Sequence, residues 1–175
     1  MADLARSDVL RALVEPILGK SYRPVRAILF DKTADANWNV FWHQDLSIAV
    51  QERKEAAGFG PWTVKSGVQH VQPPSAILEQ MLTVRLHLDN CHEANGPLQV
   101  IPRSHKQGRM NADTVRAWRE DKSPITCVAG PGAALLMRPL LLHASSSATS
   151  AGHRRVVHIE YAGMALPDGL RWYTE

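Results

Sequence analysis

The sequence contains little that would place it in a disulfide-rich, membrane-spanning or secreted class of protein. It has only two cysteines, Cys91 and Cys127, without CxxC spacing, so we expect two reduced thiols in a cytoplasmic protein. An uncharged stretch at residues 125–137 is too short to cross a bilayer and contains a Gly-Pro-Gly sequence. The first twenty residues carry charge throughout and lack the apolar centre of a signal peptide. We therefore predict no membrane association.

Neither sign of charge dominates the chain. There are 20 Lys and Arg against 17 Asp and Glu, which leaves a formal net charge of +3. The basic side chains are scattered among acidic ones, whereas nucleic-acid-binding proteins usually cluster theirs, so we expect no nucleic-acid partner. With 45% hydrophobic residues over 175 positions, the composition is that of one globular domain spanning residues 1–175.

A change in hydrophobic periodicity separates a helical beginning from a strand-rich remainder. Apolar residues recur at helical spacing over residues 3–19, and residues 111–120 are typical of a surface helix. The Gly- and Pro-rich residues 58–74 predict a long loop with one short strand. Many short strands with few helices predict a mainly β protein, either a sandwich or a barrel. The expected strands are residues 24–30, 38–50, 81–89, 96–102, 125–128, 133–137, 140–143 and 155–161.

Eight histidines are many for a chain of this length. A lone histidine on a strand is more often a satisfied polar residue than a ligand. We apply this interpretation to His92, His105, His153 and His158. His43 and Asp45 differ, because residues i and i+2 of a strand project from the same face. An imidazole beside a carboxylate suits a metal ion, although a His-x-Asp pattern alone arises often by chance.

A third ligand is expected from a distant strand. His143 ends the apolar run Leu-Leu-Leu-His, a hundred residues after His43. Two histidines and one carboxylate on one triangular face leave three coordination positions open, which is typical of non-haem Fe(II) oxygenases and not of structural zinc. We therefore predict His43, Asp45 and His143 as metal ligands and catalytic residues. The open positions suit a chelating co-substrate and O₂.

A chelating co-substrate needs a cation for its far carboxylate. Arg154 lies eleven residues after His143 on the β-like run GHRRVVHIEYA. A guanidinium can hold a carboxylate through two parallel hydrogen bonds in a partly buried place. The neighbouring Arg155 points to the other face of the same strand, and spacing alone barely separates the two. We select Arg154 and keep Arg155 as the alternative.

Four segments carry a pattern that no single motif would establish. In chain order they are WHQD, LHLDNCHEANGPLQVIPRSH, RPLLLHASS and HRRVVHIEYA, and they fall within roughly residues 24–162. Together they resemble the phytanoyl-CoA dioxygenase family of Fe(II)- and 2-oxoglutarate-dependent oxygenases. The resemblance implies a double-stranded β-helix, a jelly-roll or cupin-like barrel with a few flanking helices. It also implies His43, Asp45 and His143 as iron ligands, with 2-oxoglutarate as co-substrate.

The same resemblance suggests which residues hold the co-substrate. It implies Arg154 as the partner of the 2-oxoglutarate C5 carboxylate, because the family places this arginine about eleven positions after its distal histidine. Ser145 stands where relatives often offer a hydroxyl to the co-substrate. Lys32, on the strand before the His-x-Asp motif, is a further candidate for the same pocket.

Three features bear on how far the resemblance extends. Family members commonly show Pro-Gly-Ser-His where this chain has Arg103 in Pro-Arg-Ser-His, which leaves the local loop geometry open. The chain is also shorter than typical members, so its site is expected to be more open or completed by a second subunit. Asp45 fills the position that halogenating relatives leave to a small residue, which favours hydroxylation or a related oxidation.

Candidates for contact with substrate come from the long loop and from one strand. Trp62 and Gln69 could line the mouth of the barrel, although a core position is the more common role for such a tryptophan. Arg85 shares one face of its strand with His87 and Asp89, opposite the alternate apolar residues, and we expect this polar face to point into the barrel. An unpaired guanidinium there is costly, so Arg85 either pairs with Asp89 or meets an anionic substrate or co-substrate.

These features predict an Fe(II)- and 2-oxoglutarate-dependent dioxygenase. It would hydroxylate or otherwise oxidise a small organic substrate with O₂ and release succinate and CO₂. Two alternatives remain open. One is a cupin-like metalloenzyme that has the same three ligands but no use for Arg154, and the other is a non-catalytic jelly-roll binding module. The exposed edge strands of a short barrel favour pairing with a second copy as a homodimer.

Overall fold

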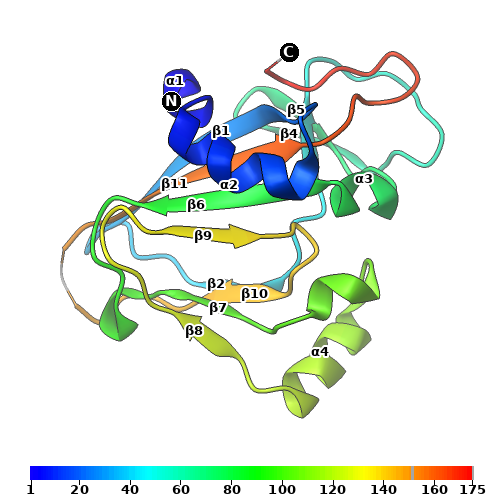
Figure 1. Cartoon of the computed structure of the whole chain (residues 1–175). Helices are drawn as coiled ribbons and strands as arrows, with labels where there is room; N and C mark the ends of the chain where they lie inside the picture. The colour runs from blue at the N-terminus through cyan, green and yellow to red at the C-terminus, as the bar shows by residue number, and fades with distance from the viewer. Residues whose placement is uncertain (151, 175) are drawn as a thin grey trace.

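Two four-stranded antiparallel sheets form the layers of a barrel (Figure 1). The computed structural model describes residues 1–150 and 152–174 of the chain. The strand order of the first sheet is β1 (Arg23–Lys32), β11 (Arg154–Ala162), β6 (Met81–His87) and β9 (Ala134–Met137). The order of the second is β2 (Val40–His43), β10 (His143–Ser145), β7 (Leu98–Val100) and β8 (Ile125–Cys127). Early and late strands alternate in both sheets, which is the double-stranded β-helix topology that the family resemblance implies.

Alternation along β6 gives the first sheet one apolar and one polar face, as its sequence predicts. Leu82 and Val84 pack in an apolar cluster with Val157 and Ile159 of β11. Arg85 is buried on the opposite face, inside the barrel. The polar interior of this sheet supplies several of the side chains that surround the site described below.

The N-terminal helices cover the outer face of the first sheet (Figure 1). The predicted helix over residues 3–19 is divided into α1 (Ala2–Ala5) and α2 (Asp8–Leu18). The division falls at Ser7, whose side chain accepts a hydrogen bond from the Leu10 amide and thereby starts a new helix. Helix α4 (Ala112–Asp121) buries none of its residues, as expected of a surface helix. No helix among the described residues is long and apolar enough to span a membrane.

Residues 58–74 contain two strands, whereas the sequence predicted a loop with one. A third sheet is built from β3 (Ile48–Val50), β5 (Val68–Val71) and β4 (Trp62–Lys65), in that order. Strands β4 and β5 form a hairpin with Ser66 and Gly67 as its two turn residues, at φ 49° and φ 78°. Two consecutive positive φ values fit the type I′ turn that closes tight hairpins. The Ser66-Gly67 pair is the sequence signal for this hairpin, and the prediction of a loop overlooked it.

Other element boundaries differ in smaller ways. Strand β10 begins at His143 instead of residue 140, because a turn closed by the Leu141 amide on the Arg138 carbonyl precedes it. Three short helices were not predicted. They are α3 (Ser75–Glu79), η1 (Glu93–Asn95) and η2 (Ser104–Gln107).

The segment after β11 belongs to the hydrophobic core. Trp172 is fully buried and packs in one cluster with Leu166 and Leu170. It forms an isolated β-bridge with Val50, and its indole nitrogen donates a hydrogen bond to the Met164 carbonyl at 3.0 Å. These contacts attach the C-terminal segment to the third sheet.

Candidate metal centre

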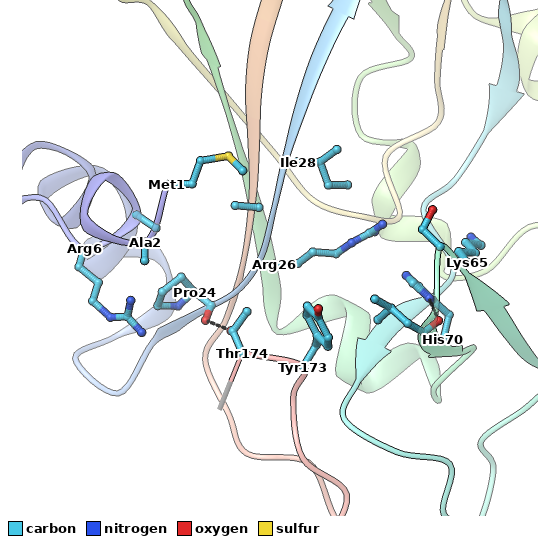
Figure 2. Close-up of a pocket in the computed structure, with 14 residues that line it drawn as sticks. Met1, Ala2, Arg6, Pro24, Arg26, Ile28, Lys65, His70, Tyr173 and Thr174 are labelled. Carbon is cyan, nitrogen blue, oxygen red and sulfur yellow. Dashed lines mark hydrogen bonds between the residues drawn. The ribbon is translucent and has the colours of Figure 1, made fainter.

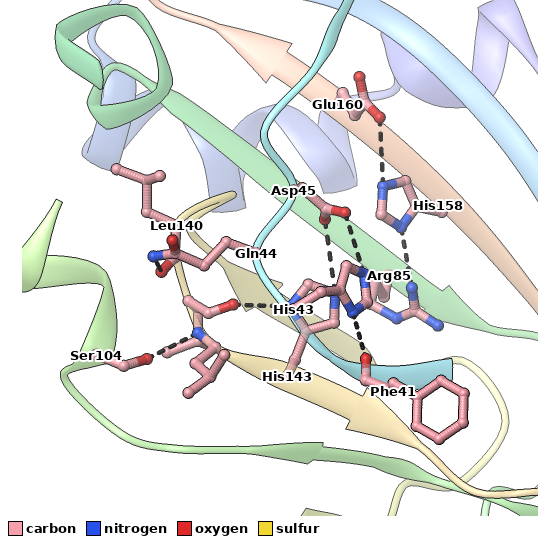
Figure 3. A network of polar contacts seen from close by, with 12 residues as sticks. Phe41, His43, Gln44, Asp45, Arg85, Ser104, Leu140, His143, His158 and Glu160 are labelled. Atoms are coloured by element: carbon pink, nitrogen blue, oxygen red, sulfur yellow. Dashed lines mark hydrogen bonds and ion pairs between the residues drawn. The ribbon is translucent and has the colours of Figure 1, made fainter. Parts of the chain in front are cut away.

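His43, Asp45 and His143 come together in one cluster (Figure 3). The two histidines are register partners across the antiparallel strands β2 and β10, with ring centroids 4.2 Å apart. The Asp45 carboxylate oxygens lie 3.6 Å from His43 Nε2 and 3.7 Å from His143 Nε2. One candidate ligand atom from each residue lies within 4.8 Å of the other two. These separations leave space for a metal ion between the donors.

Backbone contacts set the tautomer of both histidines. His43 Nδ1 lies 2.8 Å from the Phe41 carbonyl, and His143 Nδ1 lies 2.7 Å from the Leu141 carbonyl. A carbonyl oxygen can only accept, so each Nδ1 carries a proton and donates it. The lone pair of each neutral ring is then on Nε2, the atom nearest Asp45. Histidine ligands of metals are commonly oriented in this way.

Gln44, between the two ligands of the His-x-Asp motif, holds the surrounding loops together. Its amide nitrogen donates to the Leu140 carbonyl at 2.7 Å and to the Gly108 carbonyl at 2.8 Å. Its amide oxygen accepts from the Met110 amide at 2.8 Å. Gln44 was not among the site residues predicted from the sequence. The available signal was its position, because the middle residue of an extended His-x-Asp points away from the ligands and into the protein.

The electrostatics of the cluster favour the metal-binding form of two of its members. Burial lowers the pKa of His143 to about 4, and the nearby His43 adds to the shift while Asp45 opposes it. For Asp45, burial acts to raise the pKa, but contact with His43 and the charge of His143 outweigh it and hold the pKa below its usual value. A neutral imidazole and an ionised carboxylate are the forms that bind metals.

The cluster opens into a cavity of about 100 Å³. Arg85 and Arg154 come from the first sheet and face the triad across this space. The remaining walls combine apolar and polar side chains. They are Phe30, Trp38, Val40, Leu98, Ser145 and His158.

Arg154 and Arg155 have opposite environments. Arg154 is buried, lines the cavity, and its Nε and Nη1 atoms find no hydrogen-bond partner among the described residues. Arg155 is exposed and makes a two-pronged contact with the Asp89 carboxylate, at 2.7 and 2.8 Å. The structure thus brings Arg154 to the triad and leaves Arg155 on the surface. It also excludes Asp89 as the partner of Arg85.

The other two residues predicted to bind the co-substrate lie together. Ser145 lines the cavity and donates to the Gly96 carbonyl at 2.9 Å. Lys32 is buried behind Ser145, whose hydroxyl accepts a hydrogen bond from Lys32 Nζ at 3.2 Å. Lys32 also donates to the Ser146 carbonyl at 2.6 Å. It does not line the cavity, so Ser145 is the one of the two that can touch a ligand there.

Trp62 and Gln69 lie on the β4–β5 hairpin, and neither side chain lines the cavity beside the triad. Trp62 packs against the core, which is the more common role for such a residue, and Arg53 lies over its ring at 5.6 Å. Contact of either residue with a substrate stays a prediction.

A second and larger cavity, of about 520 Å³, lies between the N-terminus, β1 and the same hairpin (Figure 2). Its walls include the basic residues Arg6, Arg26 and Lys65, and none of the described residues that line it is acidic. It shares no lining residue with the triad cavity. Arg26 reaches from its wall to Glu160, whose carboxylate accepts a hydrogen bond at 3.2 Å.

The residues present fit a non-haem iron ion. The donor set is two imidazoles and one carboxylate, which leaves positions open, and the unpartnered buried atoms of Arg154 provide donors for a carboxylate beside it. A double-stranded β-helix with this donor set defines the class of non-haem iron oxygenases. Within this class the sequence matches the family described as phytanoyl-CoA dioxygenase (PhyH) over residues 3–156, so the chain belongs to that family. The predicted resemblance is confirmed.

Solved structures share the fold at low sequence identity. AviO1 from Streptomyces viridochromogenes Tue57 has a TM-score of 0.65 and 21% identity, with 94% of this chain and 62% of that chain covered. EctD from S. alaskensis has a TM-score of 0.67 and 19% identity, with coverages of 93% and 52%. The epimerase SnoN from nogalamycin biosynthesis, described as non-heme and alpha ketoglutarate dependent, has a TM-score of 0.63 and 17% identity, with coverages of 91% and 54%.

The chain therefore spans only 52% to 62% of the length of these three proteins. EctD has been solved with bound Fe and, separately, with 2-oxoglutarate and 5-hydroxyectoine. No curated protein gives a significant sequence match to the chain.

Proposed function

We propose that this protein is an Fe(II)- and 2-oxoglutarate-dependent dioxygenase that hydroxylates, or otherwise oxidises, a small organic substrate and releases succinate and CO₂. The observation that carries the proposal is the placement of Arg154 in the same cavity as the triad, with unpartnered donor atoms. A metalloenzyme without a dicarboxylate co-substrate would leave this buried guanidinium in need of another anion. The known ligands of EctD, Fe and 2-oxoglutarate, agree with this assignment.

The protein's part in the reaction is to hold and orient. His43, Asp45 and His143 would hold the iron through the two Nε2 atoms and the carboxylate. Iron bound there would supply the activation of O₂ and the oxidation of substrate, which no side chain provides. Arg154 would hold the far carboxylate of 2-oxoglutarate through charge-assisted hydrogen bonds, and the Ser145 hydroxyl stands beside it.

Part of the cavity wall is apolar, but the triad is partly open to solvent, because the side chains of His43 and Asp45 are 39% and 36% exposed. Phe30, Val40 and Leu98 line the same space as the triad, and His143 is only 4% exposed. Arg154 itself is buried, which strengthens its ionic contacts with a bound carboxylate.

The proposal is tested by succinate formation. The protein, loaded anaerobically with Fe(II), is mixed with 2-oxoglutarate, ascorbate and O₂, and succinate is quantified. We expect slow succinate formation even without the primary substrate, and its loss in Asp45→Asn, which removes the anionic ligand but keeps the side-chain shape. Asp113→Asn, which changes an exposed acid on α4, is the matched control. Iron binding without any succinate would contradict the proposal and favour a cupin-like enzyme that does not use 2-oxoglutarate.

A further inference from the structure

Arg85 is a second buried guanidinium at the triad that the proposed chemistry does not use. It is 8% exposed, lies on β6 and lines the cavity (Figure 3). Its Nη1 atom donates to Nδ1 of His158 at 3.0 Å, and its Nε atom finds no partner among the described residues. None of the carboxylates that the structure describes accepts a hydrogen bond from it. Its charge is therefore buried without a hydrogen-bonded carboxylate, although the charge of the triad residue Asp45 acts on it.

Glu160, the carboxylate beside His158, is already engaged elsewhere. Because His158 Nδ1 accepts from Arg85, the ring proton of His158 is on Nε2, which lies 3.6 Å from the Glu160 carboxylate. Glu160 in turn accepts a hydrogen bond from Arg26. His158 thus separates Arg85 from a carboxylate whose charge is balanced by another arginine. The sequence interpretation of His158 as a satisfied polar residue holds, but it did not reveal this position between two arginines.

When Fe(II) and 2-oxoglutarate occupy the site, the balance of charges leaves room for one further anion. Under the proposed function, Fe(II) is balanced by Asp45 and by the carboxylate of 2-oxoglutarate next to the metal. Arg154 is balanced by the far carboxylate. Arg85 is protonated at neutral pH and, of the two arginines that line the cavity, is the one left without a compensating anion. A buried charge without a partner is strongly unfavourable, and a bound anion removes that cost.

We propose that Arg85 binds the carboxylate of the primary substrate, so that the substrate class is small organic carboxylates. The guanidinium lies over the Phe30 ring, 5.6 Å from its centroid, which helps to hold its plane in one orientation. Val40 and Leu98 offer apolar contacts for the remainder of such a molecule. The assignment of the bound anion to a substrate rests on the proposed function, whereas the anion site itself rests on the burial and contacts of Arg85.

The test uses matched probes on protein loaded with Ni(II), which prevents turnover, and saturated with 2-oxoglutarate. Propionate and its neutral analogue propionamide are titrated by calorimetry. We expect propionate to bind at least about tenfold more tightly than propionamide, and Arg85→Gln to abolish the difference while leaving 2-oxoglutarate affinity unchanged. Arg155→Gln, which removes an exposed arginine on β11, should behave as the wild type.

Three other outcomes would contradict either the proposed role of Arg85 or the proposed function. If Arg85→Gln weakens 2-oxoglutarate binding itself and no propionate preference exists, Arg85 serves the co-substrate and the proposal fails. If the preference survives in Arg85→Gln, the anion binds elsewhere and the proposal also fails. If the Ni(II) protein does not bind 2-oxoglutarate, the proposed function fails, and a propionate preference lost in Arg85→Gln would still establish the anion site.

Thermal unfolding separates this role from a purely structural one. The Arg85→Gln side chain retains a donor for His158 but removes the unpaired charge. The ligand-free variant should therefore melt at the same temperature as the wild type or above it. A clear decrease would show that Arg85 stabilises the fold instead. If Arg85→Gln does not fold, Arg85→Lys keeps the charge without the planar fork and should retain a weakened preference for propionate.

Discussion

Gln44 donates a hydrogen bond to the main-chain carbonyl of Leu140 at 2.7 Å, across 96 positions of the chain. The contact joins the loop that carries Asp45 to the segment that leads into His143. A second link runs parallel to it, because the Asp45 amide donates to the Pro139 carbonyl at 2.9 Å. The ligands from the two distant strands are therefore held in position by main-chain and amide contacts before any metal is bound.

Replacement of Gln44 should weaken both the fold and the metal site. Gln44→Ala leaves two carbonyls and one amide without their partner, so we expect a loss of about 2–4 kcal/mol in the free energy of unfolding. We also expect metal affinity to fall by about 10–100-fold, as for other residues that support metal ligands. Urea unfolding and competition with a coloured chelator measure the two effects. Gln107→Ala, at an exposed position, is the control, and equal metal affinity in both variants would remove the positioning role.

Lys32 should make stability depend on pH above neutrality. Burial lowers the pKa of Lys32 from 10.5 to about 8, and the charge of Arg154 adds to the shift. Below pH 8 the lysine is protonated in both folded and unfolded chains, and the full cost of burying its charge is present. Between about pH 8 and 10.5 the folded protein releases the proton first, so stability rises with pH, by up to about 3 kcal/mol.

The comparison with Lys32→Met isolates this contribution. The difference in unfolding free energy between wild type and Lys32→Met should shift in favour of the wild type as the pH rises through this window. Lys106→Met, which removes an exposed lysine, should follow the wild-type curve. A constant difference from pH 7 to 10.5 would show that the pKa of Lys32 is not lowered by folding.

Arg103 occupies a backbone conformation that favours glycine. Its φ is 67° and its ψ is −1°, in the left-handed region, at the position where the family commonly has glycine. The left-handed conformation thus forms in this chain with arginine at this position. Left-handed geometry costs a residue with a Cβ atom about 1–2 kcal/mol in the folded protein, and glycine avoids this cost. Glycine also gives the unfolded chain more conformational entropy, which lowers the stability of the folded protein by about 0.4–1 kcal/mol. We therefore expect Arg103→Gly to stabilise the protein by about 0.5–1 kcal/mol.

Arg103→Ala provides the matched comparison, because it removes the guanidinium but keeps the Cβ atom. Chemical denaturation should give Arg103→Gly a higher free energy of unfolding than the wild type. The value for Arg103→Ala should be close to that of the wild type. If the alanine variant were as stable as the glycine variant, the gain would come from the loss of the charge and not from the backbone.

Features encoded by local patterns were predictable from the sequence. Alternation along β6 correctly placed Arg85 inside the barrel, and the same reasoning put Arg154 and Arg155 on opposite faces of one strand. The cluster of His43 with its two partners could be anticipated because the residue types and their order constrain the chemistry. The fold class followed from the spacing of short strands and from the family resemblance.

Other contacts between distant residues were not predictable, because no local pattern marks them. The sequence shows that Trp172 is hydrophobic, but not that it packs against Val50 on the third sheet. Nothing near Gln44 in the chain indicates its bonds to residues more than sixty positions away. Likewise, the position of His158 between Arg85 and Glu160 arises from pairing between β6 and β11.

The central claim is that Arg154 holds 2-oxoglutarate beside iron bound by the triad. It is tested most directly by anaerobic titration of the protein with Fe(II) and then with 2-oxoglutarate, following the visible charge-transfer band of the chelate. We predict that the band appears in the wild type and in Arg155→Gln at the same 2-oxoglutarate concentration. Arg154→Gln should need an at least about 30-fold higher 2-oxoglutarate concentration to form the band, because this variant loses charge-assisted hydrogen bonds in a buried place. Iron binding without the band, or equal titration of all three proteins, would contradict the account.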